Sequence, residues 1–399
     1  MNPHRALARL LLAGALLLLA GCGGGGSSGP SAGQAEAQSF DWDLPAGFPV
    51  PVTPTANPMN DAKVALGRRL FYDTRLSVND SLSCAGCHQQ RFGFADARAL
   101  PVGATGDVHP RNSMGLANVV YNATQNWANP AITTLHDQAL IPMFGEFPVE
   151  LGWSGHEQEI LDRLRLDPDY LARFAAAYPQ AHDPITPLNV AKAVAAFVAT
   201  LIAGDSAYDQ AVFQGRPQAL SAAATRGMDL FFSERLECFH CHGGFNLAQS
   251  VNFEGLAFDQ SFFQNNGLYN VDGQGGYPAD NRGLWEFTLE DRDMGRFRAP
   301  ALRNIALTAP YMHDGSIATL EEVIAHYARG GRLIESGPHA GDGAASPVKS
   351  SLIAGFSISP DEMQDLLAFF EALTDWSFIC DPALSDPFGN IPPHPRCLE

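Results

Sequence analysis

The chain has 399 residues, of which 46% are hydrophobic and 17% are charged, with 38 Gly and 28 Pro. This composition is typical of a globular protein with many loops, and it excludes collagen-like, coiled-coil and multispan membrane proteins. The 25 basic residues against 43 acidic ones give a net charge of −18, which repels phosphate backbones, so we expect no nucleic-acid partner.

The first residues have the order of an export signal. Two arginines precede an apolar run at residues 10–20, which is too short to span a bilayer and ends in Leu-Ala-Gly before Cys22. This segment resembles a bacterial lipoprotein signal. We therefore expect residues 1–21 to be removed and the protein to reside in the periplasm, where a lipid on Cys22 is its only membrane contact. Cleavage that leaves Cys22 unmodified is the alternative, and residues 22–54 are expected to form a flexible tether and an N-terminal arm.

Two C-x-x-C-H motifs, 154 residues apart, carry the chemistry of the chain. They are Cys84-Ala85-Gly86-Cys87-His88 and Cys238-Phe239-His240-Cys241-His242. Two thiols separated by two residues can add to the two vinyl groups of one haem, and the next residue can give its imidazole to the iron. A zinc site needs four protein ligands, and each motif offers three. We therefore predict two covalent haem c groups, with His88 and His242 as the proximal ligands.

The last two cysteines, Cys380 and Cys397, lie in a Pro-rich tail and have no following His. In an oxidising compartment they could form a disulfide that closes the tail into a loop. Two free thiols are the alternative, and the sequence leaves both open.

The sequence around the two haem motifs repeats, which indicates two related domains. The predicted helices, one before and one after each motif, cover residues 65–71, 189–203, 224–231 and 359–373. Each of the earlier helices has a Gly beside its apolar face, and strand-like alternation is scarce in the chain. We predict a mainly α fold of two cytochrome c-like domains with long loops, at residues 55–210 and 211–399, each holding one haem.

Several separated motifs make the chain similar to the bacterial di-haem peroxidases, the family that includes cytochrome c peroxidase, MauG and MbnH. The motifs are Arg-Asn-Ser at residues 111–113 with Asn118, and two blocks at residues 297–304 and 308–315. The resemblance covers about residues 55–380 and looks closest to the MbnH-like branch. It implies that peroxide reacts at the N-terminal haem and that the C-terminal haem transfers electrons.

In this family a Gln and a Glu lie beside the peroxide-reactive haem. Gln138, Pro142 and Glu150 match the family segment, although the interval from Gln to Glu is two residues longer than expected, which makes Glu146 a rival. A carboxylate over an open ferric iron can take a proton from bound peroxide and return it to the leaving oxygen. The segment that carries a removable distal His in many relatives does not match here. We therefore expect a five-coordinate iron and interpret His109 as a loop histidine rather than a remnant ligand.

At the second haem the resemblance points to Tyr327. This residue lies 14 positions after His313, where the peroxidases have a Met ligand and MauG has a Tyr. A tyrosinate favours oxidised iron and lowers the reduction potential. Tyr327 is therefore the expected iron ligand, and the alternative is a Tyr packed on its helix with His326 or Met312 as the ligand.

Two further sites follow from the resemblance. Trp127 resembles the tryptophan that relays electrons between the haems of the family, although a tryptophan is more often a core residue. The family also holds a calcium ion between its haems, and Asn112, Thr308 and Pro310 match the ligands of that ion. Leu236 stands where MauG has a partner-facing Trp, so any exit route for oxidising equivalents must differ here.

The sequence therefore leaves two main candidate functions open, and both are haem-dependent peroxidase chemistry. In the first, hydrogen peroxide produces high-valent haem iron, which oxidises a residue on a partner protein, a tryptophan by analogy with MbnH, through long-range electron transfer. In the second, a cytochrome c peroxidase removes peroxide with electrons from a small cytochrome. A pure di-haem electron carrier is a third possibility, but a carrier gains nothing from Gln138 and Glu150 over an open iron.

Overall fold

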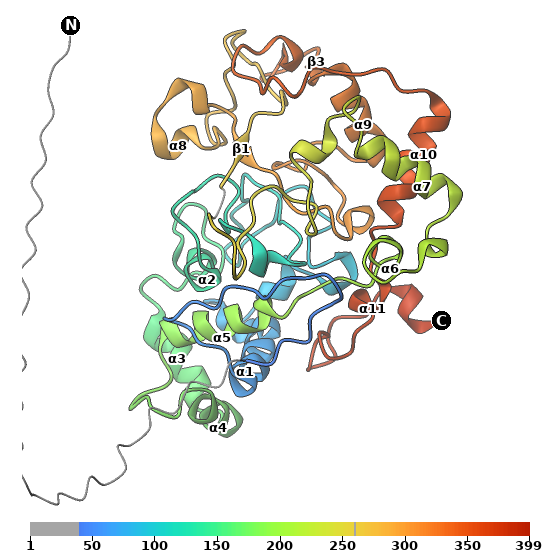
Figure 1. Ribbon diagram of the computed structural model, residues 1–399. Helices are drawn as coiled ribbons and strands as arrows, with labels where there is room; N and C mark the ends of the chain where they lie inside the picture. Colours follow the sequence, from blue (N-terminus) through green and yellow to red (C-terminus); the bar gives the residue numbers. More distant parts are fainter. Residues whose placement is uncertain (1–39, 259–260) are drawn as a thin grey trace, which may run out of the picture. The chain divides into compact units, whose positions relative to one another are not determined.

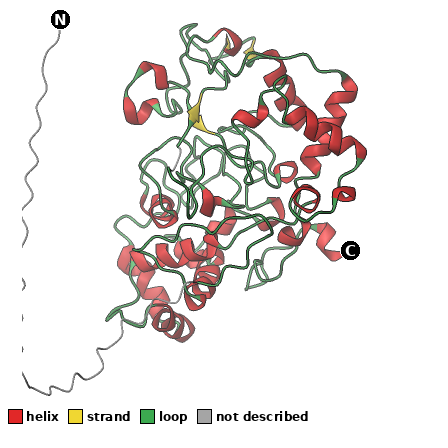
Figure 2. Cartoon of the chain, viewed as in Figure 1, coloured by secondary structure: helices red, strands yellow, loops and turns green. Residues whose placement is uncertain are grey.

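Helices and loops make up nearly all of residues 40–258 and 261–399, which are the residues that this computed structural model describes (Figures 1 and 2). The helices are α1 (Asp61–Tyr72), α2 (Leu135–Phe144), α3 (Glu157–Arg165), α4 (Pro168–Ala177), α5 (Pro187–Ala199), α6 (Ala207–Val212), α7 (Ala222–Phe231), α8 (Trp285–Thr288), α9 (Leu320–Arg329), α10 (Pro360–Glu371) and α11 (Trp376–Ile379). The predicted mainly α fold with long loops is confirmed. The predicted signal peptide, Cys22 and the tether up to residue 39 lie outside the described residues.

The strands are short and form two antiparallel pairs. The pairs are β1 (Phe263–Gln264) with β2 (Phe297–Arg298), and β3 (Leu333–Ile334) with β4 (Gly341–Asp342). In the first pair Phe263 lies opposite Arg298, and in the second Leu333 lies opposite Asp342. Two residues per strand cannot form a sheet that supports the fold, so the core is built by helices.

Each half of the described chain contains a crossed pair of helices with a Gly at the crossing. α1 packs on α5, and α7 packs on α10 (Figure 1). A Cβ atom on Gly67 would lie 1.8 Å from the Ala193 carbonyl oxygen, and one on Gly227 would lie 1.9 Å from that of Asp365. No other residue fits at these distances, because a side chain would force the backbones apart. The two glycines noticed in the sequence therefore mark equivalent helix crossings.

The helix boundaries follow local capping and differ from the predicted ones by a few residues. α5 begins directly after Thr186, whose side chain accepts a hydrogen bond from the first turn. It ends at Ala199 rather than at Ala203, because the Asn118 side chain binds the backbone N–H (2.7 Å) and carbonyl (2.9 Å) of Ala203. α10 begins after Ser359, which forms a capping box with Glu362, at the start that the sequence predicts.

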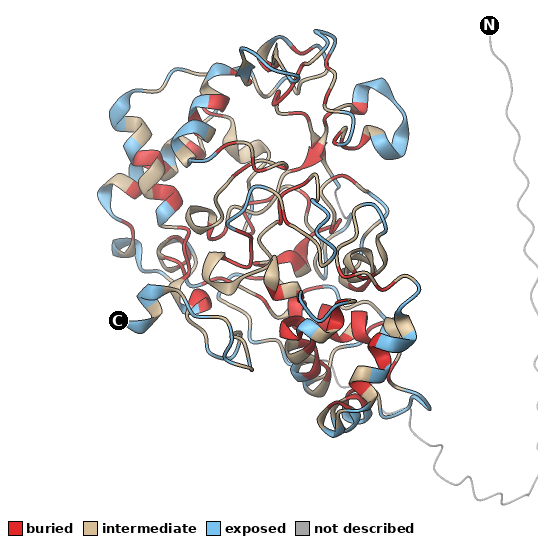
Figure 3. Ribbon diagram, turned by 180° about the vertical axis from the view of Figure 1, so that it is seen from behind, coloured by how far each residue is buried: buried red, intermediate tan, exposed pale blue. Residues whose placement is uncertain are grey.

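The C-terminal tail packs back onto the N-terminal core. Phe378 is 4% exposed within the cluster that α1 and α5 build, and the Tyr72 hydroxyl donates to the Leu384 carbonyl at 2.7 Å. The colouring by burial shows buried stretches gathered on the packed helices (Figure 3). Cys380 and Cys397 are joined by a disulfide, which decides between the two alternatives that the sequence left open. The end of the chain is therefore part of the N-terminal core.

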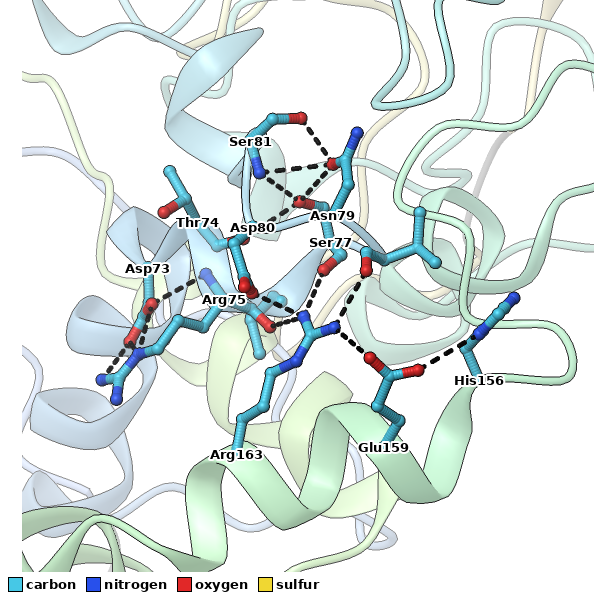
Figure 4. A network of polar contacts seen from close by, with 12 residues as sticks. Asp73, Thr74, Arg75, Ser77, Asn79, Asp80, Ser81, His156, Glu159 and Arg163 are labelled. Atoms are coloured by element: carbon cyan, nitrogen blue, oxygen red, sulfur yellow. Dashed lines mark hydrogen bonds and ion pairs between the residues drawn. The ribbon is translucent and has the colours of Figure 1, made fainter.

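An arginine on α3 fixes the loop that leads from α1 to the first haem motif. Arg163 donates to the backbone carbonyls of Ser77 (2.7 Å) and Val78 (2.9 Å), and it also pairs with Asp80 and Glu159 (Figure 4). A guanidinium with several carbonyl and carboxylate acceptors holds its partners in one geometry. This contact positions the start of the N-terminal site.

Candidate functional site

The first C-x-x-C-H motif lies on a cavity wall with one histidine nitrogen left free. Its cysteines begin on a single 3-10 turn, Cys84–Gly86. The Nδ1 atom of His88 lies 2.9 Å from the Phe94 carbonyl oxygen and 3.1 Å from that of Met114, so Nδ1 carries the proton. The Nε2 lone pair is then available to a metal. The motif lines a cavity of about 450 Å³.

The second motif repeats this arrangement. Its cysteines begin on the 3-10 turn Cys238–His240, and His242 donates from Nδ1 to the Pro300 carbonyl at 3.1 Å. Burial lowers the pKa of His242 to about 4, so the ring is neutral and keeps a free electron pair on Nε2. This motif lines a second cavity, of about 210 Å³.

The surroundings of the motif cysteines favour neutral thiols over thiolates. Neither pair is joined by a disulfide, and burial raises the pKa of Cys84 and of Cys238 to about 12. A reactive or zinc-binding cysteine needs a lowered pKa so that the thiolate is present. Neutral, buried thiols beside a mostly apolar cavity suit thioether attachment of a haem.

A buried arginine tests whether the second cavity fits a haem. Arg298 lines this cavity, is 2% exposed and has no carboxylate partner within the described part of the chain. Its Nη2 donates to the Met114 sulfur at 3.0 Å, whereas its Nη1 and the nearby His313 Nε2 are buried without a partner. Burial lowers the pKa of Arg298 to about 10, and an unpaired buried charge costs about 3–5 kcal/mol. The carboxylates of a haem would supply the missing partners, so the residues fit the group.

Glu150 lies in the first cavity together with Gln138 and Pro142 of α2. Burial alone raises the pKa of Glu150 to about 7, which lets its carboxyl both hold and release a proton near neutral pH. Gln138 accepts a hydrogen bond from the Asn126 amide at 3.3 Å. The rival, Glu146, is exposed and does not line the cavity.

His109 is a cavity residue that the sequence reasoning missed. It lies on a loop, as expected, but its ring lines the first cavity and its Nε2 is 3.9 Å from a carboxylate oxygen of Glu150. Its Nδ1 accepts the backbone N–H of Arg111 at 3.1 Å. In the sequence His109 could be compared only with the family segment that carries a distal His, which it does not match, and nothing there indicated which way the loop turns.

Trp127 lines both cavities. Its indole N–H donates to the Asn112 carbonyl at 2.8 Å, and its own carbonyl accepts the Arg298 N–H at 2.9 Å. The ring is thereby held at the boundary between the two cavities.

Tyr327, on α9, lines the second cavity together with His242. Burial raises the pKa of its hydroxyl to about 12, so it is a neutral phenol when no metal is bound. Neighbouring His326 does not line the cavity and donates instead to the Asn266 carbonyl at 3.1 Å. Met312 does line it, and its sulfur accepts the Asn266 amide at 3.4 Å. Of the three candidate ligands, Tyr327 and Met312 therefore lie on the cavity wall, and His326 does not.

The predicted calcium ligands come from two segments that are hydrogen-bonded to each other. The Asn112 N–H donates to the His313 carbonyl at 2.8 Å, and the peptide bond before Pro310 is cis. The Asn112 amide nitrogen donates to the carbonyls of Arg98 and Ala99, so the side-chain oxygen points away from those two carbonyls. Within the described chain a different group brings three possible ligand atoms together, from Glu234, Glu237 and His240, the last of which belongs to the second motif.

Within the described ranges no helix has the length and apolarity needed to cross a bilayer.

The profile of the family described as di-haem cytochrome c peroxidase matches residues 61–218. Cytochrome-c peroxidase IdrP1 of Denitromonas iodatirespirans is 34% identical over 340 residues, which cover 82% of this chain and 85% of that protein. The methylamine utilization protein MauG of Methylorubrum extorquens is 31% identical over 322 residues, which cover 80% of each. The crystal structure of a MauG-like protein associated with microbial copper homeostasis matches with a TM-score of 0.85 and 49% identity, over 88% of this chain and 99% of that one.

Proposed function

The chain belongs to the di-haem cytochrome c peroxidase family and is a haem-dependent oxidoreductase, and from this premise we propose that it uses hydrogen peroxide to oxidise a tryptophan on a partner protein. One observation carries the proposal: Tyr327 lines the second cavity with His242, and by the resemblance in sequence it stands where the peroxidases carry a Met. The 49% identity with a MauG-like protein supports the same choice. Because the relatives include both cytochrome c peroxidases and MauG, likeness alone does not choose between the two functions.

The residues of the first cavity would manage the protons of peroxide. When bound, the two haems supply iron that peroxide can oxidise and that afterwards accepts electrons. Glu150 would take a proton from one oxygen of peroxide and return it to the other oxygen, which leaves as water. Gln138 would orient the peroxide, Pro142 would limit the space in the cavity, and His88 would hold the haem iron there. A pKa of about 7 suits both halves of this proton transfer.

The residues between and beyond the cavities would move electrons. Trp127 lines both cavities and is the relay between them. Tyr327 and His242 would hold the haem iron of the second site, and Tyr327, as a phenolate, would favour the oxidised form of that iron. A partner protein can then be oxidised at the second half of the molecule, away from the peroxide.

The remaining assignments complete the proposal. Asn112, Thr308 and Pro310 hold calcium through a side-chain oxygen and two carbonyls, the donor type that calcium prefers. The protein is exported to the periplasm and anchored by a lipid on Cys22. Residues 55–210 and 211–399 act as the peroxide-reactive half and the electron-transfer half.

The test is to add stoichiometric peroxide to the purified diferric protein without a reductant. Optical, near-infrared and electron paramagnetic resonance (EPR) spectra are recorded, with the Tyr327→Met variant as the comparison. We expect a direct reaction and a long-lived oxidised state in which both haems share the charge. If nothing happens until one haem is reduced, the protein is instead a conventional cytochrome c peroxidase that draws electrons from a small cytochrome.

A further inference from the structure

A chain of aromatic rings runs from the second cavity to the protein surface. His313 lines the cavity, stacks on Phe297 with ring centroids 3.6 Å apart, and lies 6.2 Å from Tyr277. Tyr277 lies 5.4 Å from Tyr269, and Tyr269 lies 5.6 Å from the exposed ring of His339. The four inner rings are buried, with exposures of 3–7%. These are contact separations for aromatic pairs, so the chain is continuous.

The outermost tyrosine of this chain has a carboxylate as its hydrogen-bond partner. Tyr269 donates its hydroxyl to the Asp314 Oδ2 atom at 2.6 Å, while the Ser316 N–H holds the Oδ1 atom at 3.0 Å. Burial would raise the pKa of Asp314, but nearby His313 and the hydrogen bonds from Tyr269 and Ser316 bring it below its usual value. Burial raises the pKa of Tyr269, so at rest the pair is a phenol and a carboxylate. The carboxylate is therefore ready to accept a proton.

Two other tyrosines near the second cavity lack such a base. Tyr277 donates to the Asn265 amide oxygen at 3.0 Å, and Tyr311 donates to the Ile305 backbone carbonyl at 3.1 Å. An amide oxygen cannot take a proton near neutral pH, whereas a phenol that loses an electron becomes a strong acid and must lose its proton. Tyr269 is therefore the tyrosine of these three that can be oxidised to a neutral radical.

Leu236, two residues before the second haem motif, cannot provide another exit for oxidising equivalents. Leu236 is 4% exposed and lines the cavity, so the side chain there is aliphatic and faces inward. An aliphatic side chain cannot hold an oxidising equivalent, so this position is not an exit for one.

We propose that Tyr269, with Asp314 as its proton acceptor, is the residue from which oxidising equivalents produced from peroxide leave the protein, reached through Tyr277. This inference rests on the proposed function. One electron passes from the Tyr269 ring towards the second cavity, and the phenolic proton moves to the Asp314 Oδ2 atom. The neutral radical then takes one electron from the partner's residue and regains the proton from Asp314. Two such passages supply the two electrons that reduce one peroxide to water.

The test uses the full di-haem protein with stoichiometric peroxide and with neither a reductant nor a partner. Freeze-quenched EPR spectra detect a tyrosyl radical, and optical spectra follow the decay of the oxidised state. We expect Tyr269→Phe to remove the radical signal and to lengthen the optical decay several-fold, and Asp314→Asn to act in the same direction although it keeps a hydrogen-bond acceptor. The control is Tyr72→Phe, a buried tyrosine that donates to the backbone carbonyl of Leu384 and should leave both readouts unchanged.

A measurement on the unaltered chain covers the case in which a variant does not fold. After peroxide treatment with a nitroso radical trap, peptide mapping should place the adduct on Tyr269. An unchanged radical and decay in Tyr269→Phe, or an adduct confined to other residues, would overturn the inference while leaving the proposed function intact. If the wild-type optical spectrum does not respond to peroxide, the proposed function fails and this inference fails with it.

Discussion

Replacing Glu150 by Gln removes the carboxylate that we place over the peroxide-reactive iron and leaves a neutral side chain of the same size. Burial raises the pKa of Glu150 from 4.5 to about 7. A difference of this size corresponds to roughly 3 kcal/mol between the protonated and the ionised forms in the folded protein. The side chain is 26% exposed, so solvent screening is limited.

The sign of the pH effect follows from proton binding. Between pH 4.5 and 7 the folded protein keeps the proton on Glu150 while the unfolded chain has lost it, so wild-type stability falls as the pH rises through this window and levels off above it. The Glu150→Gln variant has no ionisable group at this position, so its stability does not fall in this pH window for this reason. Relative to the wild type, the variant should be equally stable at pH 4 and more stable at pH 8 by up to roughly 3 kcal/mol, or about 5 °C in Tm.

The two readouts are thermal unfolding at pH 4 and pH 8, and rapid mixing of the diferric protein with peroxide. The reaction with peroxide should slow by about 10²–10⁴-fold, which is the usual effect of losing a general acid and base. Glu146→Gln is the matched control, because this neighbour is exposed and outside the cavity. The reasoning is refuted if Glu150→Gln reacts at the wild-type rate, or if its stability follows pH as the wild type does.

Three further changes test other parts of the structure. Tyr327→Met should raise the reduction potential of the second haem in a spectroelectrochemical titration, since a neutral thioether favours reduced iron; an unchanged potential would mean that Tyr327 is not a ligand. Trp127→Phe should slow electron exchange between the haems in rapid-mixing spectra, with both haems still attached, and an unaltered rate would exclude the relay. Cys397→Ser opens the loop that begins at Cys380 and should cost about 3 kcal/mol of unfolding free energy by chemical denaturation; equal stability would show that the packing of the tail suffices.

Much of the site was predictable because its signals are local. The C-x-x-C-H motif places two thiols and an imidazole within five residues, so no tertiary information is needed to read it. Gly67 and Gly227 could likewise be recognised beside apolar helix faces, and the structure shows that both let a helix cross at backbone contact. The mainly α fold followed from the same helical spacing.

The features that sequence reasoning missed depend on contacts between distant segments. His109 meets Glu150 across 41 residues, and Arg298 lies against Met114, 184 residues away. Helix α5 ends before the predicted residue because the Asn118 side chain, from another part of the chain, forms hydrogen bonds with the backbone of Ala203. Local sequence patterns carry no information on such long-range contacts, because these contacts depend on how the loops fold over the helices.

The return of the tail to the N-terminal core has a consequence for how the protein is made. The Gln90 amide, two residues beyond the first haem motif, donates to the carbonyls of Phe378 (3.2 Å) and Asp381 (2.9 Å). A chain that emerges from its N-terminus first must therefore wait for almost its whole length before these contacts can form, whereas α7 and α10 need only the second half. A chain that lacks the tail would leave the surroundings of the first motif unfinished, so the N-terminal core matures only after the tail has been made.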